Sequence, residues 1–168
     1  MADLIQTGHN VATKLCLNGP LVRTFVGRKD RCHPSPEGNL PTQDQSADEI
    51  LELFGNMTIT PHGLVSLLGA HTCGKQFFVN ESRSGAAFDK SPASWGTEFY
   101  DEVLQDKPSE GVFRLETDEM ISRHPRAAAA WQLFTGILGV TIWFTVSNQK
   151  LISLCEAVGL IHVLGTGL

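Results

Sequence analysis

Residues 64–75 read Leu-Val-Ser-Leu-Leu-Gly-Ala-His-Thr-Cys-Gly-Lys, an apolar run that ends in a histidine. The spacing of its apolar residues predicts a helix that extends to His71. Gly69 and Ala70, directly before this histidine, are small, so a flat cofactor could approach the helix face beside it. On periodicity alone, the plainer interpretation is a helix-end histidine that interacts with the helix dipole.

The segments on either side of this run also favour a mainly α fold. Thr60 is a suitable N-cap for the helix and Pro61 suits its first turn. Further helices are predicted over 2–17, 46–55 (capped by Asp44 or Ser46, with Ile50, Leu51 and Phe54 on its apolar face), 96–104, 115–122 and 127–134. Residues 21–27 predict a short strand or extended segment, and the non-periodic stretches 28–45 and 72–96 predict long loops.

The size and charge of the chain narrow its class. Its 168 residues suffice for about one domain with its own core. The net charge of −5 argues against a nucleic-acid-binding surface. The first residues lack the basic start and apolar core of a signal peptide, and we expect the chain to be a piece of something longer.

The cysteines and asparagines bear on the compartment. Four cysteines, Cys16, Cys32, Cys73 and Cys155, allow two disulfides in three connectivities, and the absence of a CxxC pair argues against structural zinc. Two glycosylation sequons, at residues 56–58 and 80–82, give mild support for secretion.

Several blocks of sequence, taken in order, resemble the non-animal haem peroxidase superfamily, with the closest likeness to fungal secreted, class II-like members. The resemblance covers residues 1–135 and implies the proximal half of a helical haem peroxidase fold, with long loops and without the distal half. It rests on Gly27–Asp30, Leu40-Pro41, residues 46–54, residues 64–75, Phe88–Pro92, Thr97–Tyr100, Leu115–Asp118 and Ala130–Phe134.

The resemblance implies a haem b site. His71 would be the axial ligand to the iron, and Asp118 would accept the other ring N–H of that histidine. Taken alone, Asp118 could be a surface acid between two glutamates. Lys75 would contact a haem propionate, or else be a solvated loop lysine, and Phe88 would lie beside the proximal histidine.

A calcium site is also implied by the resemblance. Thr72, Asp89 and Ser91 match the family's ligand positions and offer the oxygen donors that calcium prefers. Gly96 departs from the pattern, because similar proteins have an aspartate there, and the loss of one carboxylate should weaken the site.

The distal machinery of the family is missing from this sequence. The Arg-x-x-Phe-His-like motif that carries the general base and the arginine is absent, so we identify no catalytic residue in this sequence. His9 lies in the first predicted helix without the neighbouring arginine and aromatic residue, and the distal role is not carried over to it.

The C-terminal residues 136–168 form a divergent apolar tail, partly similar to the family's last helix. No charged residue occurs from Ala127 to Gln149, a length that could cross a bilayer. The alternatives are a core helix followed by an insertion, or a sequence not native to the fold. A membrane span is the less favoured of these interpretations.

The predicted function is a haem-dependent peroxidase that uses hydrogen peroxide to oxidise small phenolic-type donors, in peroxide removal or an oxidative-stress response. The alternative is a non-catalytic haem-binding fragment that lacks the distal histidine and arginine. A third possibility is a membrane-anchored or misfolded chain without haem. The resemblance implies an extracellular glycoprotein with disulfides, with an intracellular location as the alternative.

Overall fold

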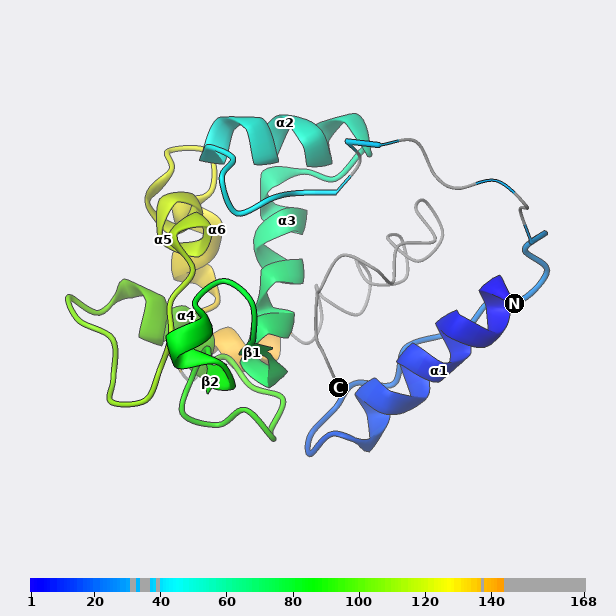
Figure 1. Ribbon diagram of the computed structural model, residues 1–168, viewed down its shortest axis with the longest axis horizontal. Helices are drawn as coiled ribbons and strands as arrows, with labels where there is room; N and C mark the ends of the chain where they lie inside the picture. The colour runs from blue at the N-terminus through cyan, green and yellow to red at the C-terminus, as the bar shows by residue number, and fades with distance from the viewer. Residues whose placement is uncertain (31–32, 34–36, 39, 137, 144–168) are drawn as a thin grey trace.

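In the computed structural model, the described residues are 1–30, 33, 37–38, 40–136 and 138–143. The fold is mainly α, as predicted (Figure 1). The elements are α1 (Ala2–Leu15), α2 (Ala47–Asn56), α3 (Pro61–Leu68), the 3₁₀ helix η1 (Gly69–Cys73), β1 (Lys75–Gln76), the 3₁₀ helix η2 (Glu81–Arg83), β2 (Ala86–Ala87), α4 (Glu98–Leu104), α5 (Glu116–Arg123) and α6 (Ala128–Leu133).

The caps of the two central helices agree with the sequence. Ser46, not Asp44, is the N-cap of α2, and its side chain and that of Glu49 form a reciprocal capping box. Thr60 caps α3 by accepting a hydrogen bond from Gly63 N–H at 3.1 Å, with a proline in the first turn. These caps are local chemistry, and they set the starts of both helices.

The stretch predicted as a featureless loop over 72–96 contains a small hairpin. Strands β1 and β2 pair antiparallel, with Lys75 opposite Ala87 and Gln76 opposite Ala86. The buried Gln76 side chain bonds the backbone of the η2 turn at both ends, at Asn80 and at Arg83. Two-residue strands are too short to give a period, which explains why the pattern missed them. Residues 21–27, by contrast, are not assigned to a strand.

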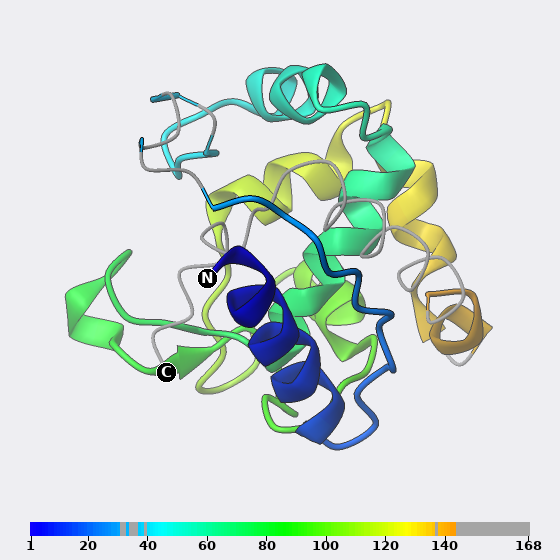
Figure 2. The ribbon, with the colours of Figure 1, turned by 90° about the vertical axis from the view of Figure 1, so that its right-hand side faces the viewer.

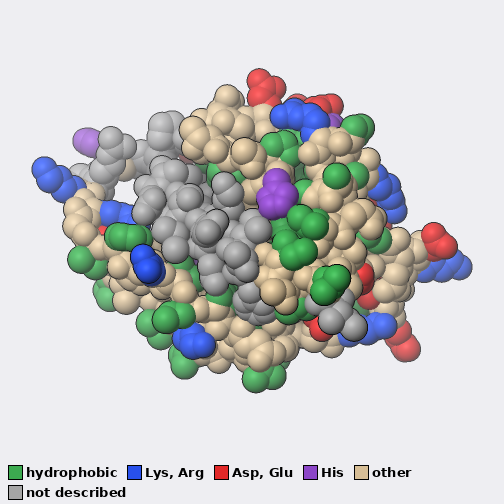
Figure 3. All heavy atoms as spheres, turned by 180° about the vertical axis from the view of Figure 1, so that it is seen from behind, with side chains coloured by type: hydrophobic (Ala, Val, Ile, Leu, Met, Phe, Trp, Pro, Cys, Tyr) green, Lys and Arg blue, Asp and Glu red, His purple; other side chains and the backbone are tan. Residues whose placement is uncertain are grey.

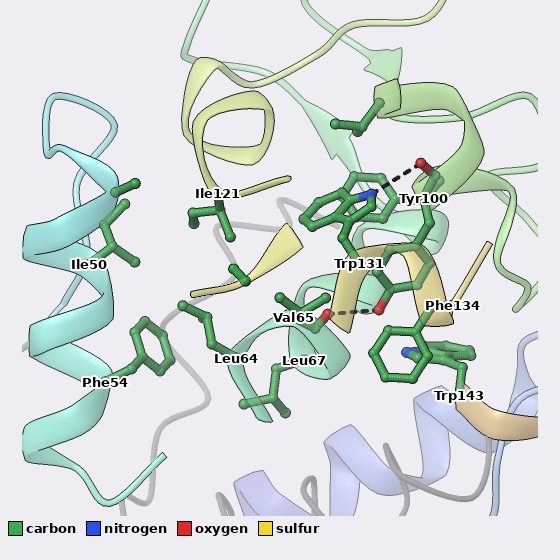
Figure 4. Packing of buried hydrophobic residues seen from close by; sticks show 14 of the residues in the cluster. Ile50, Phe54, Leu64, Val65, Leu67, Tyr100, Ile121, Trp131, Phe134 and Trp143 are labelled. Carbon is green, nitrogen blue, oxygen red and sulfur yellow. Dashed lines mark hydrogen bonds between the residues drawn. The ribbon is translucent and has the colours of Figure 1, made fainter. Parts of the chain in front are cut away.

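The core lies where α3, α4 and α6 meet (Figure 4). The Trp131 indole donates a hydrogen bond to the Tyr100 carbonyl at 3.1 Å, and the Tyr100 hydroxyl donates to the Val65 carbonyl at 2.7 Å. Phe99, Tyr100 and Trp131 pack at tilted or edge-on angles with centroids 5.2–5.5 Å apart, a preferred aromatic geometry. Leu64 and Val65 from α3 and Ile121 from α5 belong to the same cluster.

Helix α1 is confirmed, but its burial is the reverse of what its apolar spacing suggests. Gln6, Asn10 and Thr13 are buried, whereas Leu4 and Leu15 are 68% and 81% exposed. The Asn10 side chain donates to the Thr24 hydroxyl at 2.8 Å, so the inner face meets the 21–27 segment through a polar contact. Figures 1 and 2 show α1 at one side of the molecule, apart from α2 and α6.

The start of the C-terminal tail lies against the core. Residues 138–143 are helical, and the Trp143 indole donates to the Ser66 carbonyl at 2.8 Å. The rest of the tail, 144–168, with Cys155, lies outside the described residues, as does Cys32 in the 28–45 loop. No helix in the described part is both long and apolar enough to cross a bilayer.

The surface carries both signs of charge. Seen from behind, acidic and basic side chains occur at several separate places, with hydrophobic side chains between them (Figure 3).

Candidate functional site

His71 lies in η1 and not in the α-helix that was predicted to carry it. The α-helix ends at Leu68, and the chain continues as a 3₁₀ helix from Gly69 to Cys73. The last turn of α3 is held by side chains, since the carbonyls of Val65 and Ser66 accept hydrogen bonds from Tyr100 and Trp143. His71 is therefore placed by the change of winding at the end of α3.

The small residues before His71 do not leave the bare face that the sequence suggested. A Cβ added at Gly69 would lie 2.5 Å from the Tyr100 hydroxyl and would overlap the Trp143 indole. The expectation of an open approach at Gly69 is therefore wrong in this structure. The glycine instead allows two buried aromatic side chains to approach the backbone closely.

The structure brings His71 and Asp118 together. Nδ1 of His71 lies 3.0 Å from Oδ2 of Asp118, which stands in the first turn of α5. Asp118 is 1% exposed, so the interpretation as a surface acid is wrong, although its neighbours Glu116 and Glu119 are on the surface side of the helix. The bond orients the ring and leaves Nε2 as the nitrogen available to a ligand.

The pKa of His71 reflects opposing influences. Burial alone would lower the pKa of this imidazole, but the negative charge of Asp118 and the hydrogen bond to it raise the pKa, and the net shift is upward. His71 and Asp118 therefore interact electrostatically in surroundings that largely exclude water.

Two phenylalanine rings lie close to the imidazole at different angles. The centroid of the Phe88 ring lies 5.1 Å from that of His71, and the two rings are tilted by 31°. Phe88 therefore lies beside His71, as the resemblance implied. The Phe99 ring, from α4, lies at 5.4 Å and edge-on. Phe99 was part of the family-like block at residues 97–100 but was not singled out, because a sequence does not show which member of a block faces the site. Lys75 lies in β1 with its side chain exposed.

The predicted calcium ligands also converge. The Thr72 hydroxyl donates to Asp89 Oδ2 at 2.5 Å, and the backbone N–H and hydroxyl of Ser91 donate to Asp89 Oδ1 at 2.7 and 3.4 Å. Asp89 is 2% exposed. These contacts place the three residues in one oxygen-rich cluster, whose first member, Thr72, directly follows His71 in the chain.

Glu98 is a further acid at this cluster, which sequence reasoning missed. A Cβ added at Gly96 would overlap the Glu98 carboxylate, so Glu98 occupies the space of a side chain at position 96. Burial, together with the charge of Glu98, raises the pKa of Asp89, although hydrogen bonds from Thr72 and Ser91 act in the other direction. The signal that could have found Glu98 is its place two residues after the missing aspartate.

The described residues near Asp89 do not include enough histidine, cysteine and acidic side chains to form a metal site by themselves. In the described part of the chain, no group of three or more histidine, cysteine or acidic side chains is arranged to hold a metal ion. Calcium would therefore depend on hydroxyl and backbone oxygens as well as on the two carboxylates.

A partly buried histidine oriented by a buried aspartate, on a helical scaffold with aromatic rings beside it, is an arrangement suited to binding a metal through imidazole. The family model described as Peroxidase matches residues 1–136. The chain belongs to the peroxidase family.

Individual relatives agree with this assignment. The chain is 31% identical over 152 residues to ligninase C of Trametes versicolor, covering 80% of this chain and 41% of that protein. It is 31% identical over 147 residues to the low-redox potential peroxidase of Taiwanofungus camphoratus, covering 79% and 44%. It is also 31% identical over 126 residues to the cytosolic L-ascorbate peroxidase 2 of Arabidopsis thaliana, covering 74% and 48%.

The chain spans less than half of the length of these relatives. The family implies a haem cofactor, and the roles of the individual residues toward it are taken up below.

Proposed function

We propose that this chain supplies the proximal side of a haem peroxidase site that uses hydrogen peroxide to oxidise small phenolic-type donors. The observation that carries the proposal is the 3.0 Å contact between His71 Nδ1 and Asp118 Oδ2, whose side chains are 13% and 1% exposed. A bound haem b would supply the redox chemistry, with hydrogen peroxide as oxidant and the donors as reductants.

The residues present fit such a group. The Asp118 carboxylate holds the Nδ1–H tautomer of His71, so that Nε2 keeps its lone pair for iron. The negative charge also makes the imidazole a stronger electron donor. The rings of Phe88 and Phe99 restrict rotation of the imidazole. Lys75, exposed in β1, is proposed as a partner for a propionate.

The alternative is a haem-binding fragment without peroxidase turnover. The sequence lacks the family's distal histidine and arginine, the groups that would move the peroxide proton and assist cleavage of the oxygen–oxygen bond. In this alternative, His71 would still bind the haem iron and Asp118 would still orient His71. The two proposals differ only in how the bound haem responds to peroxide.

The test is a titration of the purified chain with haemin, followed by absorbance. We expect a Soret band that saturates at one haemin per chain, is lost in His71→Ala and is retained in His62→Ala. His62 lies on α3, and its ring is tilted against that of Phe134 at 5.4 Å. A band that is equal in both variants would overturn the ligand assignment.

Addition of peroxide and a phenolic donor such as guaiacol then separates the two functions. Rapid spectral change with donor oxidation would support the peroxidase. A His71-dependent band without either response would support the haem-binding fragment and exclude turnover by this chain alone.

We further propose that Thr72, Asp89 and Ser91 bind calcium and that Glu98 supplies the carboxylate absent at Gly96. Asp89 is buried and Glu98 is exposed, and two like-charged carboxylates close together are stabilised by a divalent cation. The donors are carboxylate and hydroxyl oxygens, which suit calcium better than a softer metal.

The calcium proposal is tested by thermal melting with calcium and with a chelator. We expect calcium to raise the Tm of the native chain, to have no effect on Asp89→Asn and to have a reduced effect on Glu98→Gln. Magnesium serves as the control ion. An equal calcium response in Glu98→Gln and the native chain would show that Glu98 is not a ligand.

We propose an extracellular location, supported by the fungal resemblance and by the exposure of Asn56 and Asn80 in the two sequons. The Asn80 side chain accepts hydrogen bonds from Ser82 N–H and from the Ser82 hydroxyl, at 3.1 and 2.6 Å. A mobility shift after N-glycosidase treatment of the natively produced protein would support this location. A chain without glycans would favour the intracellular alternative.

A further inference from the structure

Two cysteines far apart in the sequence meet beside the proximal histidine. Cys16 directly follows α1 and Cys73 is the last residue of η1, and both are half-buried free thiols. Burial and, after it, interaction with the Cys16 thiol raise the pKa of Cys73 to about 12, so the two thiols are near enough to interact. Both also pack against the same hydrophobic cluster.

The backbone on the Cys16 side is anchored to the segment that carries the site. The Leu17 carbonyl accepts a hydrogen bond from Trp95 N–H at 2.7 Å, and Leu17 bridges Ser94 in parallel fashion. The Asn18 side chain adds a bond to the Ser94 hydroxyl at 3.3 Å. These contacts hold the residues after α1 in place, so the position of Cys16 does not depend on the thiol contact alone.

The Cys73 side is anchored as well. The backbone N–H of Gly74 donates to the His71 carbonyl at 2.7 Å, which closes the last turn of η1 around Cys73. The Phe88 N–H donates to the Gly74 carbonyl at 3.4 Å. The backbones that carry the two thiols are therefore fixed independently of each other.

We propose that Cys16 and Cys73 are a site of covalent modification, where an intramolecular disulfide forms on exposure to hydrogen peroxide and joins α1 to the turn that carries His71. Of the three two-disulfide connectivities that four cysteines allow, one contains this pair. The proposal does not depend on haem binding, so its failure would leave the proposed function intact.

The reaction balances with peroxide as the two-electron oxidant. One thiol sulfur attacks peroxide, the oxygen–oxygen bond breaks, and a sulfenic acid and one water form. The second sulfur then displaces hydroxide from the sulfenic acid, which leaves as the second water as the sulfur–sulfur bond forms. Two thiols and one peroxide thus give one disulfide and two waters.

The test uses a Cys32→Ser/Cys155→Ser background, in which Cys16 and Cys73 are the only thiols. We expect limited peroxide to remove both thiols from reaction with Ellman's reagent and to lower the intact mass by the two hydrogens lost. Digestion with trypsin and a glutamate-specific protease should yield a crosslinked peptide pair that dithiothreitol separates. The disulfide should raise the Tm by roughly 5–15 °C.

Two controls make the result specific. The same chain oxidised in concentrated urea should form the disulfide at least about tenfold more slowly, because only the folded chain holds the sulfurs together. In Cys73→Ser, on the same background, Cys16 should give sulfenic acid or intermolecular dimers but no intramolecular crosslink.

Three results would overturn the proposal. They are thiols that persist under peroxide, oxidation of each sulfur separately to sulfinic acid, and equal rates in the folded and unfolded chain. In the native sequence, a peptide map that pairs Cys16 mainly with Cys32 or Cys155 would overturn it as well.

Discussion

Replacement of Asp118 by asparagine is the sharpest perturbation of the candidate site. Asparagine has nearly the same shape and keeps an oxygen acceptor, but it removes the negative charge that lies 3.0 Å from the His71 ring. Burial then remains the main influence on the imidazole, and burial lowers its pKa. We therefore expect the pKa of His71 to change from above its ordinary value of 6.5 to below it.

The effect on stability follows from the same contact. A hydrogen bond to a charged partner contributes about 1.5–3 kcal/mol and a neutral one about 0.5–1.5 kcal/mol, so the variant should lose roughly 1–2 kcal/mol. For a chain of this size, that loss lowers the Tm by about 2–8 °C. Because the pKa of His71 is raised in the folded state, this stabilisation is complete below pH 6.5 and is lost as the pH rises through the folded-state pKa.

The assay combines urea unfolding, followed by tryptophan fluorescence, with a pH titration of the histidine ring signals by NMR. Asp106→Asn, at an exposed loop position, is the matched control and should match the native chain in both measurements. The reasoning is refuted if the pKa of His71 stays raised in Asp118→Asn. It is equally refuted if the stability difference from the native chain grows with pH.

Three other predictions follow from the described contacts. Ser46→Ala removes half of the capping box with Glu49 and should lower the free energy of unfolding by about 1 kcal/mol in a urea titration. Gly69→Ala should lower it by about 1–3 kcal/mol because its methyl group overlaps buried aromatic side chains, whereas Gly55→Ala, which meets open space in α2, should raise it by about 0.5–1 kcal/mol. Burial lowers the pKa of His9, so stability should fall as the pH drops through 6.5, and His9→Gln should flatten this dependence in melts across that range.

The parts of the fold that depend on local chemistry were predictable from the sequence. The caps at Ser46 and Thr60 involve groups within three residues, so residue type and spacing suffice. The mainly α fold follows from the same short-range patterns. Strands β1 and β2 were not predictable in this way, because two residues per strand carry no periodicity.

For the parts of the fold that depend on residues distant in the sequence, the type of feature was predictable but its partner residues were not. Periodicity showed which residues of α1 share a face, but not that Gln6 and Asn10 would be on the inner one. The smallness of Gly69 indicated a close approach without showing that Trp143 makes it. His71 and Asp118 were paired through the family resemblance, since nothing local joins residues on α5 and η1.

The contact between His71 and Asp118 depends on the rotation and rise per residue of the 3₁₀ helix η1. A 3₁₀ helix turns about 120° and rises about 2.0 Å per residue, against about 100° and 1.5 Å in an α-helix. Over the two steps from Gly69 to His71, these differences amount to about 40° and 1 Å. At a side-chain radius of about 5–6 Å, the rotation moves the ring by roughly 4 Å, more than the length of its hydrogen bond to Asp118. Changes that rewind residues 69–71 as α-helix would therefore uncouple the two side chains while leaving both in the sequence.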